Sequence, residues 1–326
     1  MFSTTNLKEL SFLVYGLGLS GQSVVKFFKK NNIINYKVWD DKQKKLFKNK
    51  RTKNLKETLS NVDYIVLSPG ISLIEKKILI KFKKKIITDI DFLYLTNKNF
   101  KSIMVTGTNG KSTTCKLISH LLKKNKSKVL LGGNIGTPIL NLKIKKNSYV
   151  IIEASSFQLA HSQFIRPDYA FLLNITNDHL DWHGNMQNYI KSKFKIFKYQ
   201  KKNQFAFINE KLKNIFKKRN FKSKLIIPEK KNYNKIKHKI KNNYLELSIN
   251  DENMNFVYEL SRLTNISEKR FINAMNSFVG LPHRYEIFLK KKNTIFINDS
   301  KATSFESTKY ALLNSKNIYW ILGGLP

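Results

Sequence analysis

Short apolar runs recur along the first part of the chain, and each ends at a glycine or a polar cluster. The runs at 11–15, 36–40 and 63–67 are separated by helical patterns. Continuous apolar runs are typical of strands buried on both faces, and strands that alternate with helices indicate a parallel α/β sheet. We therefore expect a first α/β domain at residues 1–95.

A second series of apolar runs begins at 102–105, which leads straight into a turn with two glycines. The runs 149–153 and 169–173 follow, and a turn at 280–284 marks a boundary. We expect a central parallel-sheet domain of the P-loop type at residues 96–281.

The last part of the chain has a shorter pattern. It predicts a strand at 294–298, a helix at 307–314 and a second strand at 318–322. One helix and two strands bury too little surface to be stable alone. We therefore expect residues 282–326 to be the start of an incomplete C-terminal α/β domain.

The composition is that of a folded protein. The chain has 326 residues, of which 41% are hydrophobic and 12% aromatic, so a disordered chain is excluded. Its single cysteine, Cys115, excludes a disulfide framework. The N-terminus lacks a signal-peptide pattern, and no apolar run approaches the ~18 residues of a membrane span. We expect a cytoplasmic monomer.

The formal net charge of +38 admits two interpretations. It would attract a nucleic acid or an anionic membrane, and a nucleic-acid-binding ATPase would show DNA-stimulated hydrolysis and steeply salt-dependent binding. However, the lysines form short scattered runs, such as 83–85 and 290–292, without interleaved aromatic residues, and arginine is scarce. This distribution favours solvated lysine faces, and we expect no specific nucleic-acid partner.

The turn after 102–105 has the chemistry of a triphosphate-binding loop. It reads Thr-Gly-Thr-Asn-Gly-Lys-Ser-Thr-Thr at 106–114, and Val105 stands where the usual P-loop has its first glycine. Glycines let backbone N–H groups converge on phosphate, a helix N-terminus adds positive charge, lysine reaches the terminal phosphates, and a hydroxyl binds Mg²⁺. We predict that ATP and Mg²⁺ bind at Gly107, Thr108, Asn109, Gly110, Lys111, Ser112 and Thr113.

A second glycine turn, from Gly16 to Gly21, follows the first strand, and Asp40 ends the second strand. This spacing matches the dinucleotide fingerprint of Rossmann-like folds, which places an anionic group at a helix N-terminus. The ligand stays open: NAD, which would make the protein an oxidoreductase, another nucleotide, or none. We favour another nucleotide, because NAD binding leaves the phosphate loop unexplained.

Further candidate residues follow two strands of the central domain. Glu153 ends a buried strand, where a carboxylate beside a phosphate loop is well placed for Mg²⁺. In the polar loop at 174–183 we predict His179 as a metal ligand and Asp178 as the group that orients it, against the alternative of solvated loop side chains. Lys193 lies on an amphipathic helix among many lysines, and its local sequence predicts an ordinary surface lysine.

Together these motifs resemble the Mur ligase family, whose members make peptidoglycan precursors. The segments TGTNGKST, EASSFQL, NITNDHLDWH, GLPHR and NDSKAT occur in the family's order. The last two, with the N-terminal GLGLSG and SPGI, resemble the members that add D-glutamate. The resemblance implies ATP-dependent ligation of D-glutamate to UDP-N-acetylmuramoyl-L-alanine through an acyl phosphate. The alternatives are another Mur ligase, a folylpolyglutamate synthase-like ligase, or a binding-only fragment.

The resemblance also implies roles for individual residues. The catalytic residues would be Lys111, Glu153, His179 and Lys193. The uridine diphosphate part of the substrate would contact Leu19, Ser20, Asp40, Asp41, Ser68, Pro69 and Gly70, and the muramoyl part Asn134. Mg²⁺ would be held by Ser112, Glu153, His179 and, once carbamylated, Lys193. ATP would also contact Asn250, Asn253, Arg284 and Asp299, and D-glutamate would contact Lys301 and Thr303. Family members carry a complete C-terminal domain, and Rossmann-like N- and C-terminal domains flank their ATPase domain. We therefore expect a fragment, or the product of a truncated gene, that binds the UDP substrate but turns it over poorly.

Overall fold

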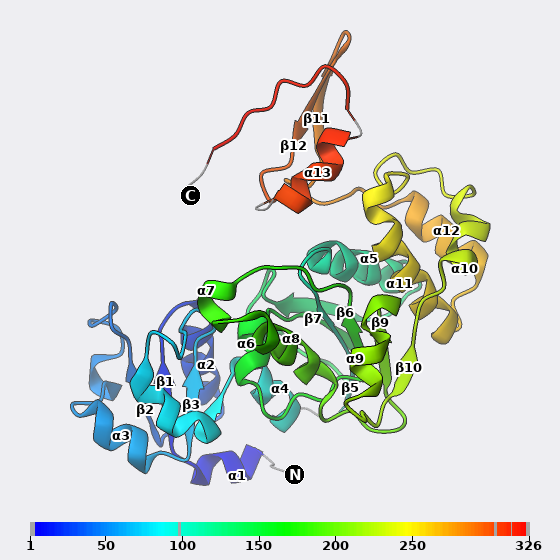
Figure 1. Ribbon diagram of the computed structural model, residues 1–326. Coiled ribbons are helices and arrows are strands. Elements are labelled where there is room, and N and C mark those ends of the chain that lie inside the picture. Colours follow the sequence, from blue (N-terminus) through cyan, green and yellow to red (C-terminus); the bar gives the residue numbers. More distant parts are fainter. Residues whose placement is uncertain (1–3, 97–98, 303–304, 314, 324–326) are drawn as a thin grey trace. The chain divides into compact units, whose positions relative to one another are not determined.

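The computed structural model describes residues 4–96, 99–302, 305–313 and 315–323 (Figure 1). The chain divides into two compact units, Met1–Pro228 and Glu229–Pro326. Across the described ranges, no helix combines the length and the apolar character needed to cross a membrane.

The first compact unit contains two parallel sheets, which confirm the α/β fold expected from the sequence. The N-terminal sheet has the order β2-β1-β3-β4, and its paired strands are parallel. Every residue of β1 is buried, which is why the sequence shows a continuous apolar run there. The elements of this part are α1 (Thr4–Glu9), β1 (Phe12–Tyr15), α2 (Leu19–Lys30), β2 (Tyr36–Trp39), η1 (Lys48–Lys50), α3 (Leu55–Asn61), β3 (Tyr64–Leu67), η2 (Lys77–Lys85) and β4 (Ile86–Ile87).

The central sheet has the order β10-β9-β8-β5-β7-β6 and is also parallel. Figure 1 shows its strands in green, and β1 to β3 in blue and cyan. The linker helix α4 precedes this sheet. The elements are α4 (Asp89–Thr96), β5 (Phe100–Thr106), α5 (Lys111–Lys124), β6 (Val129–Gly133), η3 (Ile139–Asn141), β7 (Ser148–Glu153), α6 (Ser156–His161), β8 (Tyr169–Leu172), α7 (Leu180–His183), α8 (Met186–Phe194), η4 (Lys195–Phe197), β9 (Phe205–Ile208), η5 (Glu210–Leu212), α9 (Lys213–Lys217) and β10 (Lys224–Ile226).

The order of the central strands determines where the chemistry lies. Within the sheet, β7 and β6 lie on one side of β5, and β8 lies on its other side, so the chain after β5 first adds strands on one side and later crosses to the other. Loops that leave opposite sides of one strand open a crevice at its carboxyl end, which is where open parallel sheets bind ligands. The phosphate loop follows β5 at this point.

The described part of the second compact unit contains three α-helices and a 3-10 helix, followed by a hairpin and a further α-helix. Its elements are α10 (Lys230–Lys237), η6 (Ser248–Asn250), α11 (Asp251–Leu263), α12 (Glu268–Asn276), β11 (Glu286–Lys291), β12 (Thr294–Asn298) and α13 (Phe305–Leu313). The strand expected at 294–298 is confirmed as β12, but its neighbour β11 is antiparallel and was not predicted. The prediction of a strand at 318–322 is wrong, because among the described residues this segment is not a strand and pairs with none, and Tyr319 and Ile321 are 98% and 94% exposed.

Candidate active site

The phosphate loop joins the end of β5 to the start of α5. β5 ends at the buried Thr106, and α5 begins at Lys111 without a side-chain cap. Gly110 has a φ of 81°, in the left-handed region that glycine adopts without strain. The first N–H groups of a helix have no intrahelical acceptor, so the start of α5 can receive an anion. The predicted ATP-binding residues, 107–113, surround this helix N-terminus.

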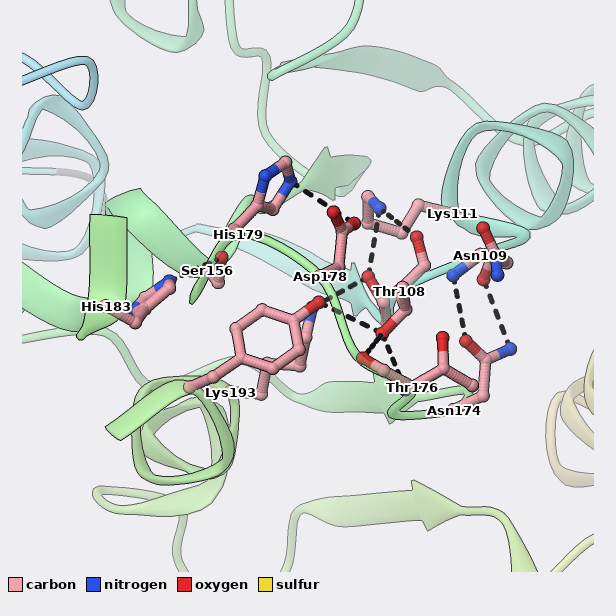
Figure 2. Close-up of polar contacts among 12 residues, drawn as sticks. Thr108, Asn109, Lys111, Ser156, Asn174, Thr176, Asp178, His179, His183 and Lys193 are labelled. Atoms are coloured by element: carbon pink, nitrogen blue, oxygen red, sulfur yellow. Dashed lines mark hydrogen bonds and ion pairs between the residues drawn. The ribbon is translucent and has the colours of Figure 1, made fainter. Parts of the chain in front are cut away.

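The loop after β8 holds the phosphate loop in shape. The N–H of Thr108 donates to the Asn174 carbonyl at 3.0 Å, and the N–H of Asn109 donates to Asn174 Oδ1 at 2.8 Å. Asn174 Nδ2 donates in return to the Asn109 carbonyl at 3.3 Å, so one side chain satisfies both backbone groups of Asn109 (Figure 2). A loop held this way needs little rearrangement when an anion binds.

Thr108 connects the phosphate loop to α8. Its Oγ1 lies 3.0 Å from the Tyr189 hydroxyl and accepts a hydrogen bond from the Thr176 N–H at 3.0 Å. Tyr189 is fully buried, and burial raises its pKa to about 12, so the hydroxyl stays protonated. Tyr189 was not predicted from the sequence. Its spacing was the available signal, because it precedes Lys193 by four residues and helix geometry puts both on one face.

Two lysine side chains converge on one carbonyl oxygen. Lys111 Nζ donates to the carbonyls of Gly107 at 2.9 Å and Thr108 at 2.7 Å. Lys193 Nζ donates to the same Gly107 carbonyl at 2.7 Å, and Figure 2 shows both lysines directed at the loop. The phosphate loop thus lies between a lysine of its own helix and a lysine of α8.

Lys193 is buried, so the prediction of a surface lysine is wrong. Its residue exposure is 1%, and its Nζ lies 4.6 Å from the ring centroid of Tyr189. Burial and the positive charge of Lys111 hold the pKa of Lys193 well below its usual value, although Asp178 acts in the opposite direction. Lysine is rarely buried without a carboxylate partner. Because lysines also occupy neighbouring positions of α8, the sequence does not distinguish the buried Lys193 from the exposed ones.

Glu153 ends β7 and is 2% exposed. Its Oε1 accepts a hydrogen bond from Asn134 Nδ2 at 2.9 Å, and its backbone carbonyl accepts the Asn134 N–H at 2.8 Å. Its Oε2 is buried and has no hydrogen-bond partner. Because an unpaired buried carboxylate oxygen is costly, this atom fits a bound cation. Asn134, expected to contact substrate, therefore lies directly beside the predicted metal ligand.

His179 and Asp178 lie together, as the sequence analysis expected. His179 Nε2 is 3.4 Å from Asp178 Oδ2, and both side chains are partly exposed. The His179 ring lies against Phe157, with 4.8 Å between the centroids. Within the described part of the chain, no group of three or more His, Cys, Asp and Glu side chains is arranged to hold a metal ion. Mg²⁺ bound here would therefore need hydroxyl, phosphate or modified lysine ligands beside Glu153.

The other histidine of this loop has a different partner. His183 Nε2 lies 3.0 Å from Ser156 Oγ at the start of α6 (Figure 2). Burial, with lesser contributions from Lys193 and His179, lowers the pKa of His183 to about 4. His183 is therefore neutral at physiological pH and joins α7 to α6.

The first glycine turn lies where β1 and β3 end side by side. Gly16 has a φ of 94°, and the Ser68 hydroxyl donates to its carbonyl at 2.9 Å. Asp40 Oδ2 accepts the Leu17 N–H at 2.6 Å. The predicted diphosphate-binding residues from three strand ends are thus brought together at the N-terminus of α2, and Pro69 and Gly70 form the turn after Ser68.

The two aspartates after β2 have different surroundings. Asp40 also accepts two backbone N–H bonds at its Oδ1, and although burial raises the pKa of Asp40, these donors outweigh it and the net shift is downward. Asp41 accepts from Trp39 Nε1 at 2.9 Å and pairs with Lys76 at 2.9 Å. Asp40 therefore shapes the glycine turn, and Asp41 links β2 to the segment after β3. Leu19, at the start of α2, is 79% exposed.

The remaining predicted residues belong to the second compact unit. Asn250 and Asn253 are 3% and 6% exposed at the start of α11, and Asn250 Nδ2 donates to the Tyr244 carbonyl at 2.6 Å. Asp299 Oδ1 accepts the Tyr285 N–H at 3.0 Å, next to Arg284 in the chain. Lys301 follows β12 and is exposed, and Thr303 lies outside the described residues.

The sequence of the chain matches two domains of one family. The Mur ligase MurD-like N-terminal domain matches residues 10–88, and the Mur ligase middle domain matches residues 105–279. The UDP-N-acetylmuramoylalanine–D-glutamate ligases of Rickettsia felis and Buchnera aphidicola are both 38% identical to this chain. These matches cover 96% of this chain and 76% and 77% of the two relatives.

Solved structures show the same fold at much lower identity. MurF from Acinetobacter baumannii has a TM-score of 0.54 and 14% identity, over 97% of this chain and 71% of its own. MurF ligase from Thermotoga maritima, solved in complex with ADP, has a TM-score of 0.53 and 19% identity, over 96% of this chain and 74% of its own. The two domain matches and the 38% identity to two ligases establish that the chain belongs to the Mur ligase family.

Proposed function

We propose that this chain is the ATP-dependent ligase that joins D-glutamate to UDP-N-acetylmuramoyl-L-alanine in peptidoglycan precursor synthesis. The observation that carries the proposal is the 38% identity to ligases of that name over 96% of this chain. The placement of the phosphate loop beside Glu153 and Lys193 supports it. The enzyme would act in the cytoplasm as a monomer on three small molecules.

The first step would make the substrate carboxylate a good acyl donor. A carboxylate oxygen attacks the γ-phosphorus of ATP, the bond to the β-phosphate oxygen breaks, and an acyl phosphate and ADP form. The N-terminus of α5 and Lys111 would neutralise charge on the transferring group. Mg²⁺, held through Glu153 Oε2 and Ser112, would add to this neutralisation when bound.

In the second step the D-glutamate amine attacks the acyl carbon, the carbon–oxygen bond to phosphate breaks, and the proton lost by the nitrogen leaves with hydrogen phosphate. His179, oriented by Asp178 at 3.4 Å, would serve as a metal ligand. Lys301 would oppose a carboxylate of D-glutamate. In the second unit, Asn250, Asn253, Arg284 and Asp299 would contact ATP, and Thr303 would contact D-glutamate.

We also propose that Lys193 is carbamylated in the active enzyme. Carbamylation joins the amine nitrogen to the carbon of CO₂ with loss of a proton, and replaces a cation by an anion. The buried position of Lys193 beside Lys111 supports this exchange, because a second cation there is unfavourable and an anion would pair with Lys111. The product would offer oxygen ligands of the kind that Mg²⁺ prefers.

The test is phosphate release from ATP with UDP-N-acetylmuramoyl-L-alanine, with and without D-glutamate. L-glutamate and L-lysine are the controls for another Mur ligase, and a γ-glutamyl folate substrate is the control for a folylpolyglutamate synthase. Release that requires both the UDP substrate and D-glutamate supports the proposal. Release with a different amino acid overturns the assignment, and binding of the UDP substrate without release identifies a binding-only protein.

A further inference from the structure

Asp89 is a buried carboxylate with no place in the chemistry above. It is the first residue of the linker helix α4, between the last strand of the N-terminal sheet and β5. Its exposure is 4%. The N–H of Ile90 donates to its Oδ1 at 3.0 Å, and the side chains of Gln158 and Ser20 lie beside the carboxylate as polar donors that oppose the effect of burial on its pKa. A hydroxyl, a primary amide and a backbone N–H carry no charge, so these donors leave the carboxylate charge uncompensated.

The two side-chain partners of Asp89 belong to the two halves of the proposed site. Ser20 lies in the first turn of α2, directly after the glycine turn proposed to bind the substrate diphosphate. Gln158 lies in the first turn of α6, and its Oε1 accepts the Ser155 N–H at 3.1 Å. Since Oε1 faces Ser155, the Nε2 of Gln158 is the atom that can donate to Asp89.

Gln158 also fixes the end of the strand that carries Glu153. Ser155 Oγ accepts the Gln158 N–H at 3.2 Å, which completes a reciprocal capping box at the start of α6. Only one residue separates Ser155 from Glu153. A change at Asp89 can therefore reach Glu153 through Gln158 and reach the glycine turn through Ser20.

We propose that Asp89 is a positioning residue that holds the diphosphate-binding turn in register with the Glu153 end of the central sheet. This inference rests on the proposed function, because it assumes that the UDP substrate binds at the glycine turn. Folding alone does not favour a carboxylate here. A buried carboxylate with neutral donors is costly, and burial raises the pKa of Asp89.

Asp91 offers a matched control two residues away. It is fully buried on the same helix and accepts backbone N–H bonds from Thr88 at 2.8 Å, Gln163 at 2.9 Å and Phe164 at 2.7 Å. Its carboxylate thus joins the linker helix to the loop after α6, and it bonds to neither Ser20 nor Gln158. Asp91→Asn should lower the unfolding temperature while the two ligand affinities stay in their wild-type ratio.

The experiment uses the full chain and two titrations, one with UDP-N-acetylmuramoyl-L-alanine and one with a non-hydrolysable ATP analogue. For Asp89→Asn we expect an unfolding temperature at or above that of wild type. We expect affinity for the UDP substrate to fall about fivefold, the equivalent of one hydrogen bond of about 1 kcal/mol. The ATP analogue, titrated in EDTA so that Glu153 holds no metal, should bind with unchanged affinity. The double variant, Ser20→Ala with Asp89→Asn, should bind the UDP substrate no more weakly than the weaker-binding of the two single variants, because both changes remove the same contact.

Each outcome separates the inference from the proposed function. Wild type that fails to bind the UDP substrate overturns the proposed function. Wild type that binds, with Asp89→Asn equal to it in affinity, overturns the positioning role alone. Equal losses for both ligands together with a lowered unfolding temperature, as in a general structural defect, also overturn the positioning role.

Discussion

Replacing Gly21 with alanine should have two opposite effects on the free energy of unfolding. Gly21 lies inside α2, where alanine is favoured over glycine by about 1 kcal/mol, so helix propensity predicts a more stable protein. However, a Cβ on Gly21 would overlap the Gly16 carbonyl oxygen and lie 2.9 Å from its carbon. These are backbone atoms, and Gly16 is held by its N–H bond to Trp39 at 2.8 Å and by the bond from Ser68.

Because the obstructing atoms cannot rotate away, the clash should outweigh the propensity gain. Overpacking a rigid site costs about 1–3 kcal/mol, and a backbone clash this short belongs at or above the upper end. After the propensity gain is subtracted, we expect Gly21→Ala to destabilise the protein by about 2 kcal/mol, which lowers the unfolding temperature by roughly 4–8 °C. Because the clash would push Gly16 away from α2 and widen the glycine turn, the variant should also bind the UDP substrate more weakly.

Thermal unfolding, together with titration by UDP-N-acetylmuramoyl-L-alanine and by a non-hydrolysable ATP analogue, tests this prediction. Gly18→Ala is the control, because Gly18 has a φ of −66° and a Cβ there would meet nothing within 4 Å. It lies at the helix cap, so we expect a change below about 1 kcal/mol. The steric reasoning is refuted if Gly21→Ala unfolds at or above the wild-type temperature, or if it binds the UDP substrate as wild type does.

Three further predictions concern the central domain. Lys193→Met, which keeps the volume and removes the buried amine, should leave the unfolding temperature unchanged or higher but reduce phosphate release at least 100-fold, about 3 kcal/mol of barrier; activity within tenfold of wild type would contradict a role for Lys193. Glu153→Gln should keep the contact with Asn134 but abolish the Mg²⁺ dependence of ATP-analogue binding, measured by titration with and without EDTA; retained dependence would place the metal elsewhere. Because the pKa of His183 falls from 6.5 to about 4 in the folded protein, its stabilising contribution is complete above pH 6.5 and is lost as the pH falls toward 4. His183→Gln should therefore lose less unfolding free energy than wild type between pH 6.5 and 4 in urea denaturation, and parallel curves would exclude this linkage.

The local patterns that predicted the fold were those whose partners lie near in sequence. Apolar runs predicted β1, β3, β5 and β7, because a strand buried on both faces needs no polar positions. The phosphate loop was recognisable because turn geometry, lysine and hydroxyl are contiguous. The false strand at 318–322 has the same apolar pattern as the true ones. It shows that such a pattern becomes a strand only where another strand pairs with it.

The sequence by itself determined the family, the α/β fold and the residues of the phosphate loop, since these depend on contiguous chemistry and on periodicity. Only the tertiary structure decided which groups meet across the sheets. It buries Lys193 beside Lys111, joins Tyr189 to Thr108, and brings Asp89 to both Ser20 and Gln158. These contacts join segments that the chain separates widely. They depend on strand order and helix packing, which no local pattern specifies.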